Sequence, residues 1–162
     1  MLVRNFNAGE ETFLRSVFFS SVHQLASRDY SPEQLEAWAP REYDDSHWIK
    51  KIRKLRPFVA EVDGCVVGYA DLQASGYIDH FYVAGSRVGR GVGRALMEHI
   101  HRAAHQRRIL ELWADVSLTA EPFFAKWNFV AETRQSVVVR GIVIPNVRMR
   151  KRLDPTGVNH PG

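Results

Sequence analysis

The hydrophobic period of the chain changes at Arg56-Pro57, and this change restricts the fold more than any other sequence feature. Before it, apolar residues recur at helical spacing, as in Trp48, Ile52 and Leu55. After it, short alternating segments are separated by turn signals such as Asp63-Gly64, a dipeptide typical of β-hairpins. Helices followed by strands predict an α+β domain.

The pattern predicts about seven strands in a mixed, mostly antiparallel sheet flanked by helices. Ser31-Pro32-Glu33-Gln34 has the form of a capping box and predicts a helix start. The alternation slips between Ile78 and Phe81, which predicts a β-bulge near Asp79 or His80. The expected strands are 2–6, 58–62, 66–72, 77–83, 109–116, 129–140 and 142–153, and the expected helices are 10–25, 32–38, 44–55, 92–106 and 119–127.

The length and composition suit one domain. The 162 residues can bury a single core, and no apolar run approaches the roughly 18 residues of a membrane span. The N-terminus lacks the pattern of a signal peptide. Cys65 is the only cysteine, which excludes an intrachain disulfide and disfavours a cysteine zinc site. We therefore expect one domain over 1–153, a flexible tail over 154–162, no metal, no membrane partner and a cytoplasmic location.

The stretch from Val83 to Arg94 joins an expected strand to an expected helix and is rich in glycine and arginine. Glycines allow several backbone N–H groups to converge on one point, and a helix N-terminus adds partial positive charge. Arg87, Arg90 and Arg94 add full charges. The stretch lacks the Lys-Ser/Thr pair of a P-loop and the spacing of a dinucleotide fingerprint. It therefore predicts a phosphate site of another kind.

Several segments together resemble the GNAT superfamily of acyl-CoA N-acyltransferases. Val88-Gly89-Arg90-Gly91-Val92-Gly93 resembles the family's pyrophosphate signature, with Val88 departing at the first position. The segment from Ile78 to Val83 resembles its bulged fourth strand, and Ala120 to Phe129 resembles its A-x-x-F-Y-x-x-x-G-F segment. Residues 30–40 resemble a YafP-like bacterial branch of the superfamily.

The resemblance implies transfer of an acetyl group from acetyl-CoA, bound as a cosubstrate, to a primary amine of a small molecule or a peptide. The transfer would occur by direct attack in one ternary complex. Pantetheine would lie like an added strand between the fourth and fifth strands, and the diphosphate would lie on the glycine loop. The residues expected to contact acetyl-CoA are Phe81, Tyr82, Val83, Val88, Gly89, Arg90, Gly91, Val92, Gly93, Arg94, Ser117 and Phe124.

The resemblance also suggests where a general base could lie. Asp79 and His80 adjoin the expected bulge, and Asp115 lies late in the fifth strand; a solvated strand edge is the alternative for each. Phe124 stands where many members have a tyrosine acid, so the thiolate would leave without a phenolic proton donor. Aromatic residues of the N-terminal helices, Tyr30 and Trp38, are candidates for the acceptor site, with core packing as the alternative.

Two other functions remain open at this stage. The substituted tyrosine position would suit an acyl-CoA sensor without turnover. The net charge of +4 and the run Arg148-Met149-Arg150-Lys151-Arg152 would suit a nucleic-acid-binding module, although an exposed edge strand explains the run equally well. We regard nucleic acid as the weaker alternative. The sequence does not fix the oligomeric state, and a homodimer is one of the alternatives.

Overall fold

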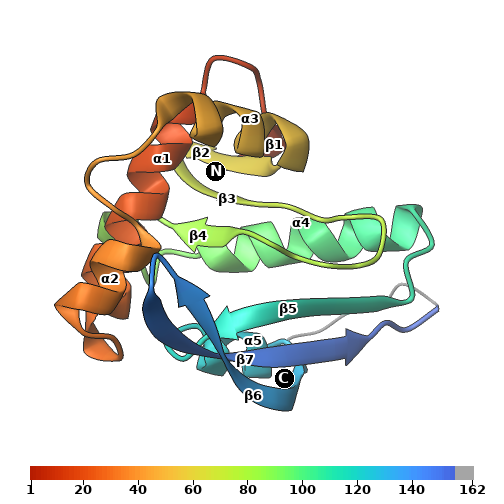
Figure 1. The fold of residues 1–162 in the computed structure, drawn as a ribbon. Coiled ribbons are helices and arrows are strands. Elements are labelled where there is room, and N and C mark those ends of the chain that lie inside the picture. Colours follow the sequence, from red (N-terminus) through yellow and green to blue (C-terminus); the bar gives the residue numbers. More distant parts are fainter. Residues whose placement is uncertain (156–162) are drawn as a thin grey trace.

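The computed structural model describes residues 1–155 and contains two antiparallel sheets in that range. The first sheet has the order β1-β2-β3-β4 and the second the order β5-β7-β6, which confirms an α+β fold with seven strands among these residues (Figure 1). Their bounds are β1 Leu2–Asn5, β2 Phe58–Val62, β3 Cys65–Ala70, β4 Phe81–Val83, β5 Glu111–Ser117, β6 Val130–Val139 and β7 Ile142–Arg152.

The two sheets are joined by a parallel bridge between Tyr77 and Trp113. Ile78 N donates to Trp113 O over 2.9 Å, and Trp113 N donates to Gly76 O over 3.0 Å. Gly76 has a φ of +85°, and a Cβ at this position would lie 1.9 Å from Glu111 O. Glycine therefore allows the close approach that holds the sheets together, and on one side of this junction β4 and β5 separate.

The N-terminal helical part begins with α1 (Glu11–Ser20), which continues as a π-turn, η1 (Ser21–Leu25), and a 3₁₀ turn, η2 (Ala26–Arg28). A single regular helix over 10–25 was expected, so the sequence pattern missed this change of helical pitch. Helix α2 (Pro32–Trp38) begins with the predicted capping box, and α3 (Asp45–Leu55) follows. Figure 1 shows α1, η1 and α2 crossing the end of the molecule where the two sheets diverge.

The remaining two helices of the described residues pack on different sheets, α4 on the first and α5 on the second. Helix α4 (Val92–Gln106) follows a 3₁₀ turn, η3 (Gly85–Arg87), and buries the predicted face that includes Leu96 and Ile100. Helix α5 (Glu121–Lys126) is shorter than the expected 119–127, has no side-chain cap, and leaves Thr119 outside it. Thr119 Oγ1 instead donates to Asp29 Oδ2 over 2.7 Å.

The expected strand over 77–83 is also shorter than predicted. Only Phe81–Val83 forms β4, because the residues before it leave the regular ladder and bond to the side chain of Asp71. The break lies at Asp79 and His80, where the slip in alternation predicted an irregularity. Residues 156–162, most of the expected tail, lie outside the described residues.

Two hydrophobic clusters hold the fold together. One lies between α4, α5 and both sheets and includes Leu96, Leu112 and Val147. The other lies between α1, α2, α3 and the opposite face of the first sheet, and it includes Leu14 and Tyr69. The two clusters cover both faces of β3 and β4. Side-chain packing therefore holds the backbone of β4 in place beside the gap that separates β4 from β5.

Candidate active site

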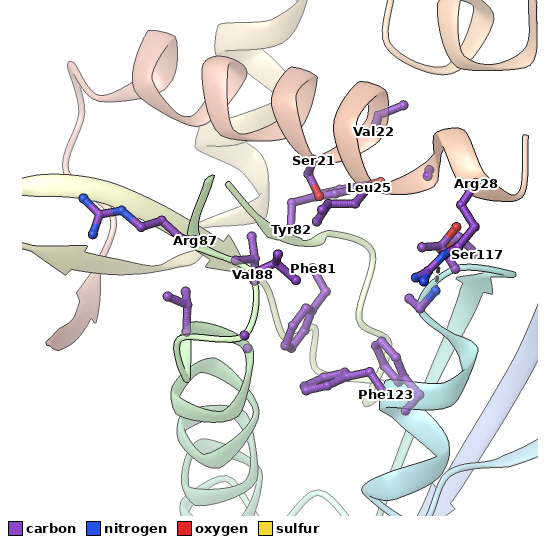
Figure 2. A pocket seen from close by; sticks show the side chains of 18 of the residues that line it. Ser21, Val22, Leu25, Arg28, Phe81, Tyr82, Arg87, Val88, Ser117 and Phe123 are labelled. Atoms are coloured by element: carbon purple, nitrogen blue, oxygen red, sulfur yellow. Dashed lines mark hydrogen bonds between the residues drawn. The ribbon is translucent and has the colours of Figure 1, made fainter. Parts of the chain in front are cut away.

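A cavity of about 440 Å³ lies where β4 and β5 separate (Figure 2). Its wall comes from η1, β4, the glycine loop, the start of α4 and the segment between β5 and α5. A smaller cavity of about 60 Å³ continues from it between the two strands and includes Asp79 and Asp115. The predicted acetyl-CoA contacts that line the large cavity are Phe81, Tyr82, Val83, Val88, Gly89, Gly91, Val92, Gly93, Arg94, Ser117 and Phe124.

The backbone of β4 offers free hydrogen-bonding groups to this cavity. Ala84 N donates to Val67 O over 2.9 Å, and Asp71 N donates to His80 O over 3.1 Å. In an antiparallel ladder, bonded pairs alternate with non-bonded pairs. The peptide groups of Phe81 and Val83 therefore point away from β3, toward the gap between β4 and β5. Along β5, the N–H and C=O groups of Trp113 bond to the Gly76–Ile78 segment. By the same alternation, every second peptide group of β5 after Trp113 points toward the gap.

The glycine loop meets the cavity at the N-terminus of α4. Gly89 and Gly91 adopt φ values of +74° and +83°, which L-residues with side chains rarely adopt. A Cβ on Gly93 would lie 3.2 Å from the ring of Phe123, on the cavity wall. The loop and the helix terminus therefore present backbone, without side chains, to a ligand. A helix of 15 residues adds partial positive charge at this end.

The arginines of the loop differ in position. Arg87 and Arg94 line the cavity, and Arg94 also pairs with Glu98 over 2.9 Å. Arg90 is absent from the wall of either cavity in the described residues. Arg28, which the sequence analysis did not single out, lines the cavity from η2, at the opposite end from Arg87 (Figure 2).

Phe124 and Ser117 lie on the side of the cavity formed by β5 and α5. The Phe124 ring is 3% exposed and packs against Phe81 and Phe129 at 5.5 and 5.0 Å between centroids. Ser117 Oγ accepts a hydrogen bond from Ala120 N over 3.1 Å, just before α5 begins. This wall is thus mostly apolar, with the hydroxyls of Ser117 and Thr119 as its polar groups.

Asp79 and Asp115 lie two residues beyond the bridge that joins the sheets, one on each side of the gap. Both line the smaller cavity, next to the bridged pair Tyr77 and Trp113, whose rings lie 4.3 Å apart. Burial, with the charges of both aspartates, raises the pKa of Tyr77 to about 12. The two carboxylates therefore lie near the point where the strands separate.

Each of these carboxylates is paired with a cation. Lys51 Nζ, from the partly exposed side chain of a residue on α3, lies 2.7 Å from Asp79 Oδ2. Arg148 bonds both oxygens of Asp115 at 2.9 and 3.2 Å, and Gln135 donates to Asp115 over 2.8 Å. The ion pairs fix the orientation of both carboxylates.

His80 lies in an aromatic cluster on the other side of β4. Its Nδ1 is 3.0 Å from the hydroxyl of Tyr69, and its ring stacks on Phe18 at 5.9 Å between centroids. Burial lowers the pKa of His80 to about 4. The imidazole is therefore neutral near pH 7.

The two candidate acceptor residues occupy different environments. Tyr30 is buried, and its hydroxyl donates to Pro145 O over 2.6 Å and accepts from Leu118 N over 3.0 Å. Tyr30 thus connects the N-terminal helical part to the second sheet and does not line either cavity described above. Trp38 lines both cavities and donates from Nε1 to the Tyr82 hydroxyl over 3.3 Å.

Three of the four cations in the basic run of β7 are bonded within the chain, and Arg152 is exposed. Arg150 bonds Glu111 and Glu132, and Lys151 is buried, with Nζ 2.8 Å from Nε2 of His101. Together with the Arg148 pair, these contacts leave little free charge for a nucleic acid. Within residues 1–155, no group of three His, Cys, Asp or Glu side chains is arranged to hold a metal ion, and no helix is long and apolar enough to cross a bilayer.

Two sheets that separate at an interrupted strand, with a glycine loop and helix N-terminus beside the gap, define the acyl-CoA N-acyltransferase fold. The sequence matches the acetyltransferase (GNAT) domain family over residues 26–153. It is 34% identical over 148 residues to the uncharacterized N-acetyltransferase YafP of Escherichia coli K12, covering 91% of this chain and 93% of that protein. The chain therefore belongs to the GNAT acetyltransferase family and is an N-acetyltransferase.

Solved structures agree with this assignment. A GCN5-related N-acetyltransferase from Rhodopseudomonas palustris superposes with a TM-score of 0.89 at 34% identity, covering 94% of this chain and 95% of that one. PaiA N-acetyltransferase from Thermoplasma acidophilum, solved in complex with coenzyme A, gives a TM-score of 0.74 at 16% identity, covering 94% and 98%. The second comparison shows the shared fold.

Proposed function

We propose that this enzyme transfers an acetyl group from acetyl-CoA to a primary amine by direct attack within a ternary complex. The observation that carries the proposal is the cavity between β4 and β5, where the open peptide groups of Phe81 and Val83 lie near the N-terminus of α4. The complex of the Thermoplasma protein with coenzyme A supports this choice of donor. The large and the small cavity share part of their walls, which suits a donor in one and an acceptor in the other.

The glycine loop would bind the diphosphate of the donor. Backbone N–H groups around Gly89 and Gly91 and the positive end of α4 favour an anion at this point. Arg87 and Arg28 would add charge from the two ends of the cavity. Gly93 keeps space open beside Phe123, where any side chain would narrow the channel. The pantetheine amides would then pair with Phe81 and Val83 as an additional strand does.

Acetyl-CoA supplies the acetyl group and a thiolate leaving group, while the amine nitrogen forms the new C–N bond. An open backbone N–H such as that of Phe81 would stabilise the carbonyl oxygen as it gains negative charge. Asp79 or Asp115 would accept the proton of the attacking amine through water. His80 is the weaker candidate, because it lines neither cavity and its Nδ1 is bonded to the Tyr69 hydroxyl.

The departing sulfur meets no phenol at position 124. A thiol has an ordinary pKa of about 8.5, so a thiolate can leave without an obligatory proton donor. The Tyr82 hydroxyl is near the cavity, but burial raises its pKa and it accepts the bond from Trp38. Phe124 would therefore serve as an apolar wall for the donor.

We further propose that the acceptor is an amine with an apolar or aromatic body. The smaller cavity is bounded by Trp38, Tyr82 and Phe124, and Asp79 and Asp115 also line it. The aromatic rings would contact the apolar part, and the carboxylates would attract the amine. This places the nitrogen near the point where the two strands separate.

A panel of amines tested with acetyl-CoA by thiol release would test the function. We expect turnover with one or more small aromatic or aliphatic amines and no thiol release without an amine. A matched variant, Gly93→Val, should lose turnover with every amine because it narrows the donor channel. Absence of turnover across the panel, with CoA bound, would favour the sensor alternative.

A further inference from the structure

We propose that Asp71 is a positioning residue for acetyl transfer, because its carboxylate fixes the path of the backbone that places Asp79, His80 and Phe81 at the cleft. The inference rests on the proposed function, since the path of this backbone matters for activity only if the cleft is the active site. Asp71 directly follows β3 and lies outside every motif that the sequence analysis used.

The first observation is the set of bonds that Asp71 accepts. Its side chain is 0% exposed, and Oδ1 accepts hydrogen bonds from Asp79 N over 2.8 Å and from His80 N over 2.7 Å. Gln73 Nε2 donates to the other oxygen over 3.2 Å. Successive N–H groups of a regular strand point to opposite sides. Two consecutive N–H groups that converge on one oxygen therefore require an interruption of the strand.

The second observation is the register on either side of this interruption. Asp71 N bonds to His80 O over 3.1 Å, and Gln73 N bonds to Tyr77 O over 2.9 Å. Between these two bonds, the chain advances two residues from Asp71 to Gln73 but three residues from Tyr77 to His80. The segment that leads into β4 therefore carries one extra residue, as in a β-bulge. An extra residue leaves amides that the ladder cannot bond, and the Asp71 carboxylate accepts them.

The third observation is what the interrupted segment carries. Asp79 lines the smaller cavity and forms the ion pair with Lys51. His80 is followed directly by Phe81, whose N–H is open toward the gap. With Asp71 in place, the N–H groups of Asp79 and His80 are directed to β3, so the first free N–H along this segment is that of Phe81.

The charge of Asp71 strengthens these bonds. Burial raises its pKa to about 6, with a further increase from the nearby Asp79 charge and opposing effects from the two amides and Gln73. The other charged and titratable groups around it include His80, Tyr69, Tyr77, Tyr82, and Lys51, which pairs with Asp79. Near pH 7 the carboxylate is ionised, and hydrogen bonds to an ionised acceptor are shorter and stronger than neutral ones.

Loss of the Asp71 carboxylate should impair the chemical step and leave CoA binding nearly intact. Without an acceptor at position 71, the buried amides of Asp79 and His80 lose their partner, and the segment must shift to find others. A displacement of about 1 Å at reacting groups can lower a rate on the order of a hundredfold. The glycine loop and Val83 are held by other contacts, so binding of CoA should change little.

The experiment compares Asp71→Leu, Asp71→Asn and a control, Val67→Ala. Asp71→Leu keeps the branching of the side chain, with methyl groups in place of the oxygens, and removes the acceptor; we expect kcat to fall on the order of a hundredfold with the KM for acetyl-CoA within about threefold. Asp71→Asn keeps a carbonyl oxygen and should recover most of kcat. Val67 is a buried residue of β3, so Val67→Ala should lower Tm and leave kcat unchanged.

A second readout does not depend on activity or on the stability of the leucine variant. In ¹H–¹⁵N spectra, the amides of Asp79 and His80 should resonate downfield in the wild type and titrate together, and Asp71→Asn should abolish this titration. The inference is overturned if Asp71→Leu keeps wild-type kcat, if Asp71→Asn is as inactive as Asp71→Leu, or if the two amides do not titrate together. Inactivity of the wild type toward the whole amine panel would instead refute the proposed function, and the amides would still test the placement of the carboxylate.

Discussion

Replacing Asp71 by asparagine should stabilise the protein at neutral pH, and the stabilisation should disappear in acid. The side chain is removed from solvent, and its pKa rises from the ordinary value of 3.8 to about 6 chiefly because burial disfavours the charged form. A raised carboxyl pKa means that the folded protein binds the proton more tightly than the unfolded chain. The contribution of Asp71 to the free energy of unfolding is therefore most favourable below pH 3.8, and this contribution is lost as the pH rises through 6.

The magnitude follows from the size of the shift. A difference of about 2 units, at about 1.4 kcal/mol per unit, amounts to about 3 kcal/mol between the protonated and ionised extremes. Asparagine presents the same carbonyl oxygen without a titrating proton. Between pH 4 and pH 7.5, the stability of Asp71→Asn relative to the wild type should rise by about 2–3 kcal/mol, or roughly 5–10 °C in Tm for a chain of this size.

Urea unfolding of the two proteins at several pH values would measure this difference. Groups such as His80 titrate in both proteins, so their contribution largely cancels in the comparison. Val67→Ala has no titrating atom and should show the same loss at every pH. A difference between Asp71→Asn and wild type that stays constant or reverses would show that the amide bonds, and not burial, control the ionisation of Asp71.

Three further predictions concern the cavity directly. CoA at 100 times its Kd should stabilise the folded enzyme by about 2.7 kcal/mol, and the double change Gly91→Val and Gly93→Val should abolish the rise in Tm; an unchanged rise would remove the glycine loop from the binding site. Asp79→Asn or Asp115→Asn should lower kcat/KM most below neutral pH and leave CoA affinity nearly intact, and wild-type pH profiles for both would exclude them as the base. Phe124→Ala should cost about 3–5 kcal/mol of stability, whereas Phe124→Tyr should change kcat less than tenfold; a hundredfold gain would mean that proton donation limits the reaction.

Local signals in the sequence predicted the parts of the fold that depend on neighbouring residues. The capping box at Ser31 and the hairpin turn at Asp63-Gly64, where both residues have positive φ, form as expected. The slip in alternation before Phe81 marked the correct place for an irregular strand. Each of these features is decided within about four residues, so the spacing of residue types contains the information.

Features that depend on distant contacts could not be predicted in this way. The bond between Thr119 and Asp29 spans 90 residues, and it explains why Thr119 does not cap α5. Tyr30 bonds to Leu118 and Pro145, so it connects two parts of the chain and does not reach the cavity wall. A single aromatic residue gives no sequence signal that separates such a structural role from a contact with substrate.

The same limit applies at the site. Asp71 looks like the polar end of a strand, and only the fold shows that its carboxylate meets two amides from a segment eight and nine residues later. Lys51 lies on the polar side of α3 by spacing, yet the packing of α3 brings it to Asp79. The positions of the glycine loop and of the aspartates along the chain could be predicted. The cations that pair with those aspartates could not.

Direct transfer of the acetyl group from acetyl-CoA to an amine, in the cavity between β4 and β5, can be followed with a ¹³C-labelled acetyl group by mass spectrometry of both protein and product. We expect labelled amine with the wild type, no labelled protein when the amine is omitted, and no labelled amine with Gly93→Val. Labelled protein that passes its acetyl group to an amine added later, or normal product formation by Gly93→Val, would contradict this expectation.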